Sequence, residues 1–439
     1  MKETLEEDSL LIVLTYAPAG LGHLRVTDAL YHGLSENTKP VLFGSRDETI
    51  KKIHRYTSIH PWARKIYEWM QDGPFSFFFI RIYKAYLSKN TKILYRELTA
   101  ILEGSKASKI LFVATHFGLA HQIVSLRQRI EGERGVRIFV AVSVTDDYAH
   151  PMWYVEGANV ITVPSKKTKE KFLKIRQDFM FKEVRIEVLP YPLSPFLTSP
   201  LSPAEAKNRF EQLLGSLNVP IHISIPVSGA AVGLTYYSEL ISELLNLSQR
   251  FIFHIVSRQA LYTEGFLRRF SGNSRVKIYS SKVDSEVVDF YDNLFLSQTI
   301  SLEITKPSEH AFKALLDSNK KGGVLLLFTQ AFGFQELSNL EFLKRHYLIP
   351  EEDTQKLIWE MGEVSEKLKN DACGWRGLKL PDSPKAAAQF IGWCLRAGIF
   401  SQMLLCRGDP KEIDPEPGEL SKNGVQKFWE LAYGLINTP

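Results

Sequence analysis

Short runs of apolar residues recur along the first part of the chain, and each is followed by a polar or small-residue loop and a more helical stretch. Runs of this length predict buried strands, and their alternation with helices is typical of a parallel α/β sheet. The runs are SLLIVLTYA (9–17), KILFVATH (109–116), RIFVAVSVT (137–145) and NVITVPS (159–165). The pattern therefore predicts an α/β domain over residues 1–195.

The same alternation starts again after a connector that is rich in proline and serine, YPLSPFLTSPLSP (191–203). Such a composition suits an extended linker between domains. The later runs are IHISIPVSG (221–229), RFIFHIVSR (250–258), VKIYSS (276–281), SLEITK (301–306) and GGVLLLFTQ (322–330), with a helix expected over 235–249. We expect a second α/β domain over residues 204–415, and a last helix within 420–439 that packs across both domains.

Length and composition agree with a two-domain globular protein. The chain has 439 residues, 44% of them hydrophobic and 23% charged, and chains of this length usually form two cores. No apolar run reaches the ~20 residues of a membrane-spanning helix, and the acidic start MKETLEEDS does not resemble a signal peptide. Three cysteines without metal-ligand spacing suit a reducing compartment and no disulfide framework, which predicts a cytoplasmic protein. The net charge of +5 is too small to indicate a nucleic-acid partner.

One loop combines glycines with a histidine. After the first apolar run, LTYAPAGLGHLRVTDAL (14–30) places Gly20 and Gly22 next to His23. Glycines permit a tight turn, and the helix that follows would direct free N–H groups at a ligand. An imidazole here can accept a proton from a hydroxyl near neutral pH. The loop is therefore either a simple turn or part of an active site with His23 as general base.

Two further loops collect polar side chains at the ends of predicted strands. They are TDDYAHPMW (145–153), with Asp146, Asp147, His150 and Trp153, and THFGLAH (115–121), with His116. In parallel sheets ligands bind beyond the carboxyl ends of the strands. Three interpretations are open: ordinary loop polarity, a metal site, or an active-site wall in which Asp146 orients an imidazole and Trp153 offers a flat apolar surface.

Seven stretches share order and spacing with a known family: GLGHLRVTDAL (20–30), HPWARKIYEWM (60–70), THF (115–117), TDDYAHPMWYVEGANVITVPS (145–165), IVSRQ (255–259), ITKP (304–307) and QELSN (335–339). Together they resemble the glycosyltransferases that include plant monogalactosyldiacylglycerol synthases and bacterial processive diacylglycerol glucosyltransferases. The peptidoglycan N-acetylglucosaminyltransferase is a more distant member. The resemblance spans most of the chain.

The resemblance implies a GT-B architecture, in which two Rossmann-like α/β domains with parallel sheets face an interdomain cleft. The first domain would bind the acceptor and the second the nucleotide-sugar, which is a co-substrate, with no metal and no cofactor. It implies His23 as the base and Asp146 as its supporting carboxylate. Acceptor contacts would come from Gly22, His116, His150 and Trp153. Donor contacts would come from Ser228, Gly229, Arg258, Lys306, Gln335, Glu336 and Asn339.

The chain departs from this family at the donor motif. Relatives continue lysine-proline with two glycines, a threonine and a glutamate that holds the ribose, whereas this chain reads ITKPSEHAFKALLD. Ser308 and Glu309 stand at the glycines, Ala311 at the threonine and Ala314 at the glutamate. A carboxylate at Glu309 would repel a diphosphate. Either the donor is held in another way, or the architecture is kept and the chemistry is lost or exchanged.

Aromatic and basic residues mix within HPWARKIYEWMQDGPFSFFFIRIYKAYLSK (60–89), which includes Arg81, Lys84 and Lys89, and a second basic stretch is KKTKEKFLKIR (166–176). The first is either a helix packed in the core or a surface for an anionic membrane, and the second is either a solvated helix face or added electrostatic attraction. Together they favour a peripheral membrane protein.

The leading hypothesis is a GT-B glycosyltransferase-like protein that moves a hexose from a nucleotide-sugar, such as a UDP-sugar, to a lipid such as diacylglycerol. It would act at the cytoplasmic face of the cell membrane. Two alternatives stay open because the fold does not determine the chemistry: a catalytically inactive binding protein of the same fold, and a sugar-nucleotide epimerase or hydrolase.

Overall fold

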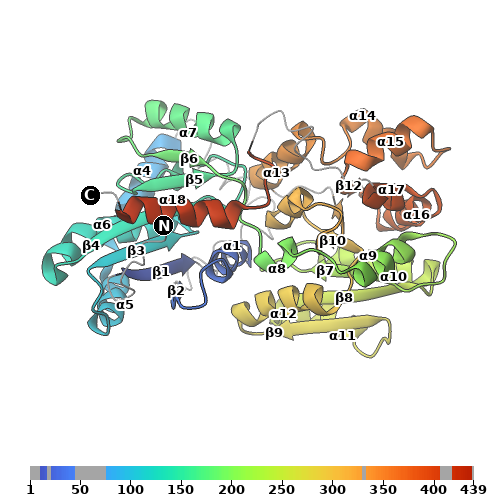
Figure 1. Ribbon diagram of the computed structural model, residues 1–439, viewed down its shortest axis with the longest axis horizontal. Coiled ribbons are helices and arrows are strands. Elements are labelled where there is room, and N and C mark those ends of the chain that lie inside the picture. The colour runs from blue at the N-terminus through green and yellow to red at the C-terminus, as the bar shows by residue number, and fades with distance from the viewer. Residues whose placement is uncertain (1–9, 17–20, 45–75, 329–332, 406–417, 438–439) are drawn as a thin grey trace. The chain divides into compact units, whose positions relative to one another are not determined.

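The computed structural model describes residues 10–16, 21–44, 76–328, 333–405 and 418–437 (Figure 1). By their internal contacts the residues form two compact units. Unit 1 comprises Met1–Pro192 and Asn423–Pro439, and unit 2 comprises Leu193–Lys422. Each unit contains one six-stranded sheet in which all strand pairs are parallel. The predicted fold class, α/β with two Rossmann-like domains on parallel sheets, is confirmed.

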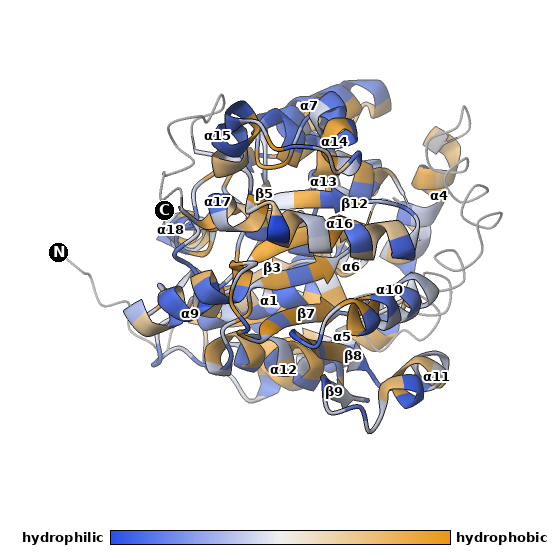
Figure 2. Cartoon of the chain, turned by 90° about the vertical axis from the view of Figure 1, so that its right-hand side faces the viewer, coloured by the Kyte–Doolittle hydropathy of each residue, from blue (hydrophilic) through white to orange (hydrophobic). Residues whose placement is uncertain are grey.

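The sheet of unit 1 has the strand order β2-β1-β3-β4-β5-β6. Its strands are β1 (Leu10–Tyr16), β2 (Val41–Gly44), β3 (Lys109–Ala114), β4 (Arg137–Ser143), β5 (Val160–Val163) and β6 (Ile186–Val188). Its helices are α1 (Leu21–His32), α4 (Ser76–Lys89), α5 (Lys92–Glu103), α6 (Phe117–Arg134), the short 3₁₀ helix η2 (Pro151–Trp153), α7 (Lys166–Phe179) and α18 (Gly424–Asn437). The strands form where the sequence has nearly continuous apolar runs, as expected for a parallel sheet that is covered on both faces (Figure 2).

The last helix, α18, returns the chain to unit 1. The indole N–H of Trp429 donates to the carbonyl of Leu30 at 2.9 Å, and Lys109 Nζ donates to the carbonyl of Ile436 at 3.2 Å. Gly424 at its start lies so close to the backbone of Pro190 and Tyr191 that a Cβ would collide with their carbonyl oxygens. The position therefore requires glycine.

The sheet of unit 2 has the order β12-β11-β10-β7-β8-β9. Counted within the unit this is the 3-2-1-4-5-6 order of dinucleotide-binding folds. Its strands are β7 (Ile221–Pro226), β8 (Phe251–Arg258), β9 (Val276–Ser281), β10 (Leu302–Thr305), β11 (Val324–Phe328) and β12 (Gly377–Leu380). Its helices are α8 (Pro195–Thr198), α9 (Pro203–Leu213), α10 (Leu234–Leu247), α11 (Leu261–Phe270), α12 (Asp284–Ser297), the 3₁₀ helix η3 (Glu309–Leu315), α13 (Phe334–Arg345), α14 (Glu352–Trp359), α15 (Glu366–Gly374), α16 (Pro384–Arg396) and α17 (Ile399–Leu405).

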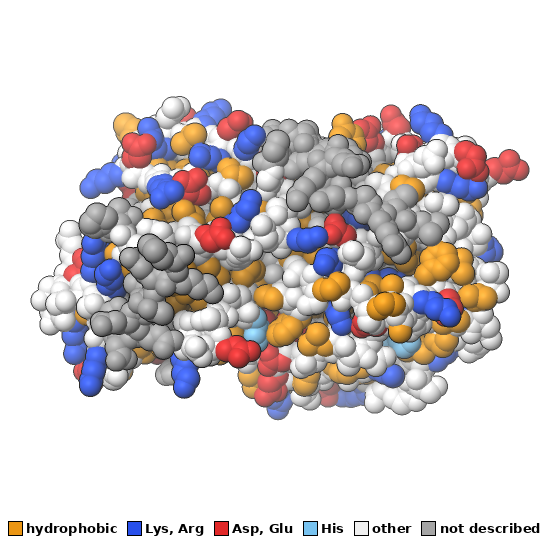
Figure 3. Space-filling model, in the orientation of Figure 1, with side chains coloured by type: hydrophobic (Ala, Val, Ile, Leu, Met, Phe, Trp, Pro, Cys, Tyr) orange, Lys and Arg blue, Asp and Glu red, His pale blue; other side chains and the backbone are white. Residues whose placement is uncertain are grey.

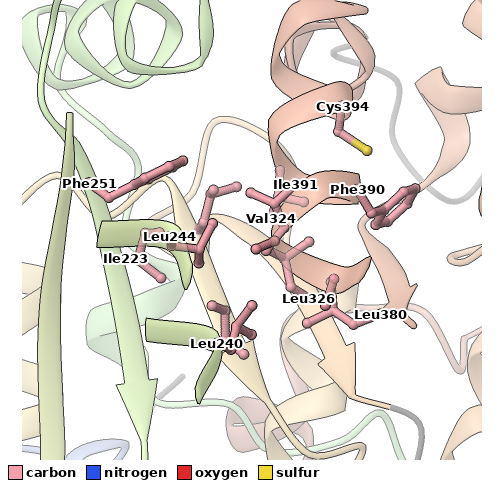
Figure 4. Close-up of a cluster of buried hydrophobic side chains, with 14 of the residues drawn as sticks. Ile223, Leu240, Leu244, Phe251, Val324, Leu326, Leu380, Phe390, Ile391 and Cys394 are labelled. Atoms are coloured by element: carbon pink, nitrogen blue, oxygen red, sulfur yellow. The ribbon is translucent and has the colours of Figure 1, made fainter. Parts of the chain in front are cut away.

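The main apolar core of unit 2 lies on one face of its sheet. Figure 4 shows Ile223 and Val324 from the strands meeting Leu244 of α10 and Ile391 of α16. Cys394 is a free, fully buried thiol in this core. Cys373, in contrast, is disulfide-bonded.

The other face of the same sheet carries buried polar side chains. Glu303 pairs in register with Ser224, and Ser224 pairs in register with His254, so the three side chains lie on one face. All three are fully buried. His254 Nε2 lies 2.9 Å from His222 Nδ1, and its Nδ1 lies 3.4 Å from the hydroxyl of Tyr279. Apolar and polar side chains alternate along β7 (IHISIP) and around His254 in β8 (FIFHIVSR). One face of the sheet is therefore apolar and the other carries polar side chains.

Each sheet has a point where the strand order reverses, and in such sheets ligands bind outside the carboxyl ends of the two strands concerned. In unit 1 the reversal lies between β1 and β3, which pair from Leu10↔Lys109 to Thr15↔Ala114. In unit 2 it lies between β7 and β10. Some of the sequence motifs, THF after β3 and ITKP at the end of β10 among them, lie at these points.

Candidate functional site

The reversal point of unit 1 brings three aromatic rings together. His23, in the first turn of α1, has its ring centroid 5.3 Å from that of His116, which caps α6, with the two rings nearly perpendicular. The centroid of Trp153, in η2, is 5.9 Å from that of His23. Three residues that are far apart in the sequence therefore meet at one edge of the sheet. Trp153 itself is buried and packs edge-on against Phe117.

Threonine hydroxyls hold this edge together. Thr27 Oγ1 and Thr115 Oγ1 both donate to the carbonyl of His23, at 2.9 and 3.1 Å, and lie 2.8 Å from each other. They tie the first turn of α1 to the end of β3. A Cβ at Gly118 would lie 2.8 Å from Cε1 of His116, so this glycine leaves room for the imidazole. The backbone and the rings are thus fixed locally.

The hydroxyl of Thr145 lies beside both His23, the predicted general base, and Asp146, its predicted supporting carboxylate. Its Oγ1 is 3.4 Å from Nδ1 of His23 and 3.4 Å from Oδ2 of Asp146. The carbonyl of Thr145 accepts a hydrogen bond from the buried hydroxyl of Tyr191 at 3.1 Å. His23 and Asp146 could be singled out from the sequence, but Thr145 could not, because the loop motif alone does not show where a neighbouring hydroxyl points.

The other residues of this loop have contacts that serve the fold. Asp147 accepts hydrogen bonds from the hydroxyls of Ser165 and Thr168, and Ser165 caps α7. His150 Nδ1 accepts from the backbone N–H of Met152 at 3.2 Å, and burial lowers the pKa of His150 to about 4. His150 is therefore a neutral imidazole that caps η2.

The glycine loop is placed differently from the expectation. Gly22 already lies in the first turn of α1, so it is not the residue of a tight turn before the helix. Gly20 and the segment HPWARKIYEWM (60–70) lie outside the described residues. His23 lies in the first turn of the same helix, which follows the central strand β1.

In unit 2 the loop after β7 leads into the N-terminus of α10. The hydroxyl oxygen of Ser228 is buried and has no hydrogen-bond partner among the described residues. The carbonyl of Gly229 accepts from the hydroxyl of Tyr262 at 3.0 Å. Ala231 has a φ of +55° and Gly233 a φ of +85°, so the backbone here takes left-handed conformations that favour glycine. Ala231 takes up such a left-handed conformation although it carries a Cβ.

The two cations predicted at the donor diphosphate are each paired with a carboxylate. Arg258 Nε lies 3.2 Å from Oδ1 of Asp284, which begins α12. Lys306 Nζ lies 2.7 Å from Oε1 of Glu336, in the first turn of α13. Internal carboxylates thus stand where a phosphate would be expected, beside cations and helix N-termini.

The QELSN motif is brought to the same edge as Lys306. The side-chain amide of the buried Asn339 donates to the carbonyl of Pro307 at 3.2 Å, next to Lys306 in sequence, while Gln335 is exposed. Lys306, Glu336 and Asn339 are therefore assembled at the reversal point of unit 2. Ser228 and Gly229 follow the other strand of that point, β7.

The segment that departs from the family motif folds into the interior. It forms the 3₁₀ helix η3, in which Ala311 and Ala314 are fully buried. Lys313 Nζ lies 2.8 Å from Oε2 of Glu303, to which the hydroxyl of Tyr291 also donates at 2.8 Å. Burial alone would raise the pKa of Glu303, but the Lys313 ammonium and the neighbouring His310 hold it at about 2. A buried charge network thus stands in place of the expected ribose contact.

Two properties of the described ranges concern a possible metal site and membrane insertion. Within them, no three or more His, Cys, Asp or Glu side chains are grouped so that they could hold a metal ion. No helix in those ranges is long and apolar enough to cross a bilayer.

No protein-family model matches the chain. No curated protein matches it in sequence. Among solved structures, a UDP-GlcNAc 2-epimerase from Neisseria meningitidis bound to UDP-GlcNAc aligns over 97% of this chain and 100% of its own, with 10% identity and a TM-score of 0.49. A UDP-glucosyltransferase from Polygonum tinctorium aligns over 99% and 100%, with 13% identity and a TM-score of 0.46. MurG of Acinetobacter baumannii aligns over 97% and 99%, with 10% identity and a TM-score of 0.45. Likenesses of this degree assign neither activity nor substrate to this chain.

Proposed function

We propose that this protein is a glycosyltransferase that transfers a hexose from a nucleotide-sugar, such as a UDP-sugar, to the hydroxyl of a lipid such as diacylglycerol. The observation that carries the proposal is the position of His23. Its imidazole lies at the reversal point of the unit 1 sheet. It is in contact with the hydroxyl of Thr145, which also contacts Asp146. Such an arrangement suits a general base that is supported by a carboxylate.

In the proposed reaction His23 takes the proton of the acceptor hydroxyl as its oxygen attacks the anomeric carbon of the sugar. The bond from that carbon to the diphosphate breaks, and the nucleoside diphosphate leaves with the bonding electrons. Asp146 stabilises the imidazolium that forms. In unit 2, Arg258 and Lys306 would neutralise the leaving diphosphate, each exchanging its internal carboxylate for a phosphate oxygen.

A lipid acceptor is supported by the surface of unit 1. Helix α4 exposes 62% of Phe78, 51% of Ile82 and 55% of Tyr86, which recur at helical spacing on one side. Met180, the residue that ends α7, is 76% exposed. Lysines of α7 are exposed as well. At the upper left of Figure 3, where Figure 1 labels α7, blue basic side chains lie with red acidic ones among them. Exposed aromatic and aliphatic groups beside lysines suit an anionic bilayer surface.

One basic residue of α4, Lys84, is not part of this surface. Lys84 turns inward, where its ammonium donates to the carbonyl of Tyr154 at 2.8 Å and lies 3.6 Å from the ring centroid of Phe181. Burial lowers the pKa of Lys84 to about 7. The expectation that Lys84 meets headgroups is therefore wrong, and Arg81 and Lys89 are the exposed basic residues of α4. The proposed location stays peripheral, at the cytoplasmic face of the cell membrane.

The direct test is transfer to diacylglycerol in vesicles, measured with a panel of UDP-sugars and with His23→Ala. Loss of a general base costs about 10²–10⁴-fold in rate, so we expect turnover to fall by that factor while the variant remains folded. His32→Ala is the matched control because His32 lies on the same helix and pairs with Asp28. Full turnover by His23→Ala would remove His23 from the reaction, and no transfer by the wild type would refute the proposed function.

A catalytically inactive binding protein is the second candidate, and one observation favours it. Both cations predicted at the diphosphate, Arg258 and Lys306, are already neutralised by Asp284 and Glu336. A ligand phosphate would have to displace these carboxylates, which weakens its net attraction. Absence of both transfer and nucleotide binding in the wild type would support this candidate.

A further inference from the structure

Thr145 is in contact with both groups that the proposed reaction pairs. Its hydroxyl oxygen lies at the same distance, 3.4 Å, from His23 Nδ1 and from Asp146 Oδ2. We propose that Thr145 is the positioning residue of this site: it links His23 to Asp146 and fixes the imidazole proton on Nδ1, so that Nε2 is the basic atom. The inference rests on the proposed function and adds the group through which the carboxylate acts.

The chemistry of the three side chains sets the direction of the link. An ionised aspartate can only accept hydrogen bonds, and a threonine hydroxyl has one proton and two lone pairs. If the proton of Thr145 points to Asp146, only lone pairs are left for His23. His23 must then donate from Nδ1, which leaves the lone pair on Nε2. When Nε2 takes the acceptor proton, Nδ1–H stays on Thr145, and the polarised hydroxyl carries the stabilising effect of the carboxylate.

Both ends of the link are anchored by backbone contacts. Thr145 is almost fully buried, and its carbonyl is held by the hydroxyl of Tyr191. The carbonyl of His23 is held by two threonine hydroxyls. The two distances exceed the usual length of about 2.9 Å, and catalytic hydrogen bonds of ligand-free enzymes often shorten when the substrate binds. A fixed backbone with slightly long side-chain contacts fits a site that tightens on binding.

Two further rings lie beside the His23 ring. His116 meets it edge-on, and Trp153 lies tilted beside it. A protonated His116 would lower the pKa of His23 by repulsion. The titration of His23 must therefore be followed together with that of His116 in the same sample, so that the effect of Thr145 is not confused with that of the second imidazole.

The experiment records the tautomer of His23 directly, by ring ¹⁵N NMR of histidine-labelled protein, with His23→Gln to identify its signals. We expect Nδ1–H in the wild type. Thr145→Val, which keeps the shape, should shift the ring to Nε2–H and lower its acid-base midpoint by about one pH unit, a tenfold change in the acid constant. Thr145→Ser should restore both. Thr162→Val, which removes a buried hydroxyl bonded to the carbonyl of Val142, should change neither.

An Nε2–H tautomer in the wild type, or a Thr145→Val spectrum identical to it, would overturn the link. Transfer assays separate this result from the proposed function. We expect Thr145→Val to lower kcat about 10- to 100-fold with little change in KM, the effect of removing a group that orients another. If the spectra change as expected but the wild type transfers no sugar, the proposed function fails and the link stands. If the wild type is active, His23→Ala is inactive and Thr145→Val is fully active, the link fails.

Discussion

Acidification should destabilise this protein through three buried histidines. Burial lowers the pKa of His121 and His254 to about 3 and that of His150 to about 4. In the unfolded chain each would titrate near the ordinary value of about 6.5. The unfolded state therefore binds more protons below that value, so stability falls as the pH falls through 6.5, and it continues to fall until the native rings take up protons.

The size of the effect depends little on the native pKa values as long as they lie well below 5. At pH 5, protonation of one histidine stabilises the unfolded state by about 2 kcal/mol. The native state gains nothing, because its histidine stays neutral, so the free energy of unfolding falls by that amount. His121 and His150 lie in unit 1 and His254 in unit 2. We therefore expect unit 1 to lose about 4 kcal/mol between pH 7 and pH 5. Unit 2 should lose at least about 2 kcal/mol, because burial also lowers the pKa of His222. Lys84 contributes little to this change, because the difference in bound protons between its unfolded and native states lies mostly above pH 7.

The assay is urea unfolding read by pulsed hydrogen exchange and mass spectrometry, with peptides of β3 and β4 reporting unit 1 and peptides of β7 and β8 reporting unit 2. His150→Asn is the decisive variant, because asparagine can still cap η2 but does not titrate. It should reduce the pH-dependent loss of unit 1 by about 2 kcal/mol and leave unit 2 unchanged. A loss below about 1 kcal/mol in unit 1, or a His150→Asn profile equal to that of the wild type, would refute the reasoning.

Three further outcomes follow from the geometry. Phe78→Ser should weaken sedimentation with anionic vesicles several-fold, and added salt should weaken it further, because both the apolar and the charged part of the contact are reduced; a wild type that ignores such vesicles at low salt contradicts the membrane surface. Calorimetry should find weak uridine diphosphate binding by the wild type and about tenfold tighter binding by Asp284→Asn, which frees Arg258; equal affinities would show that the ion pair does not limit binding. Gly424→Ala should cost about 1–3 kcal/mol of unfolding free energy, whereas Gly434→Ala, where an added Cβ meets no atom within 4 Å, should be neutral or stabilising; equal effects would contradict the close approach at Gly424.

The strands could be predicted because their cause is local. A buried parallel strand needs a short apolar run, and each predicted run contains an observed strand, as 109–116 contains β3 and 250–258 contains β8. The edge at which His23 and His116 meet could be predicted as well, because parallel strands bring their carboxyl ends to one side. The short strands β2, β6 and β12 (Gly377–Leu380) were missed, because they do not lie within a longer apolar run that stands out in the sequence.

The charge pairs could not be predicted in the same way. Asp284 follows Arg258 by a whole helix and a strand, and nothing in either motif indicates that the carboxylate would return to the guanidinium. Lys84 has the same sequence context as its exposed neighbours Arg81 and Lys89, and only the packing of α4 decides that it points inward. Such outcomes depend on tertiary contacts, which a motif does not encode.

The altered donor motif has a different meaning in the structure than in the sequence. Compared with the family that its sequence resembles, the chain lacks a ribose carboxylate at Ala314. In the structure that side chain is fully buried, in a short 3₁₀ helix that also buries Lys313 against Glu303. A glutamate at this position would place a further charge in the interior, where an unpaired ion costs several kcal/mol. Any ribose contact must come from another element, so the partners of Arg258 and Lys306 are the better place to look for the determinants of ligand choice.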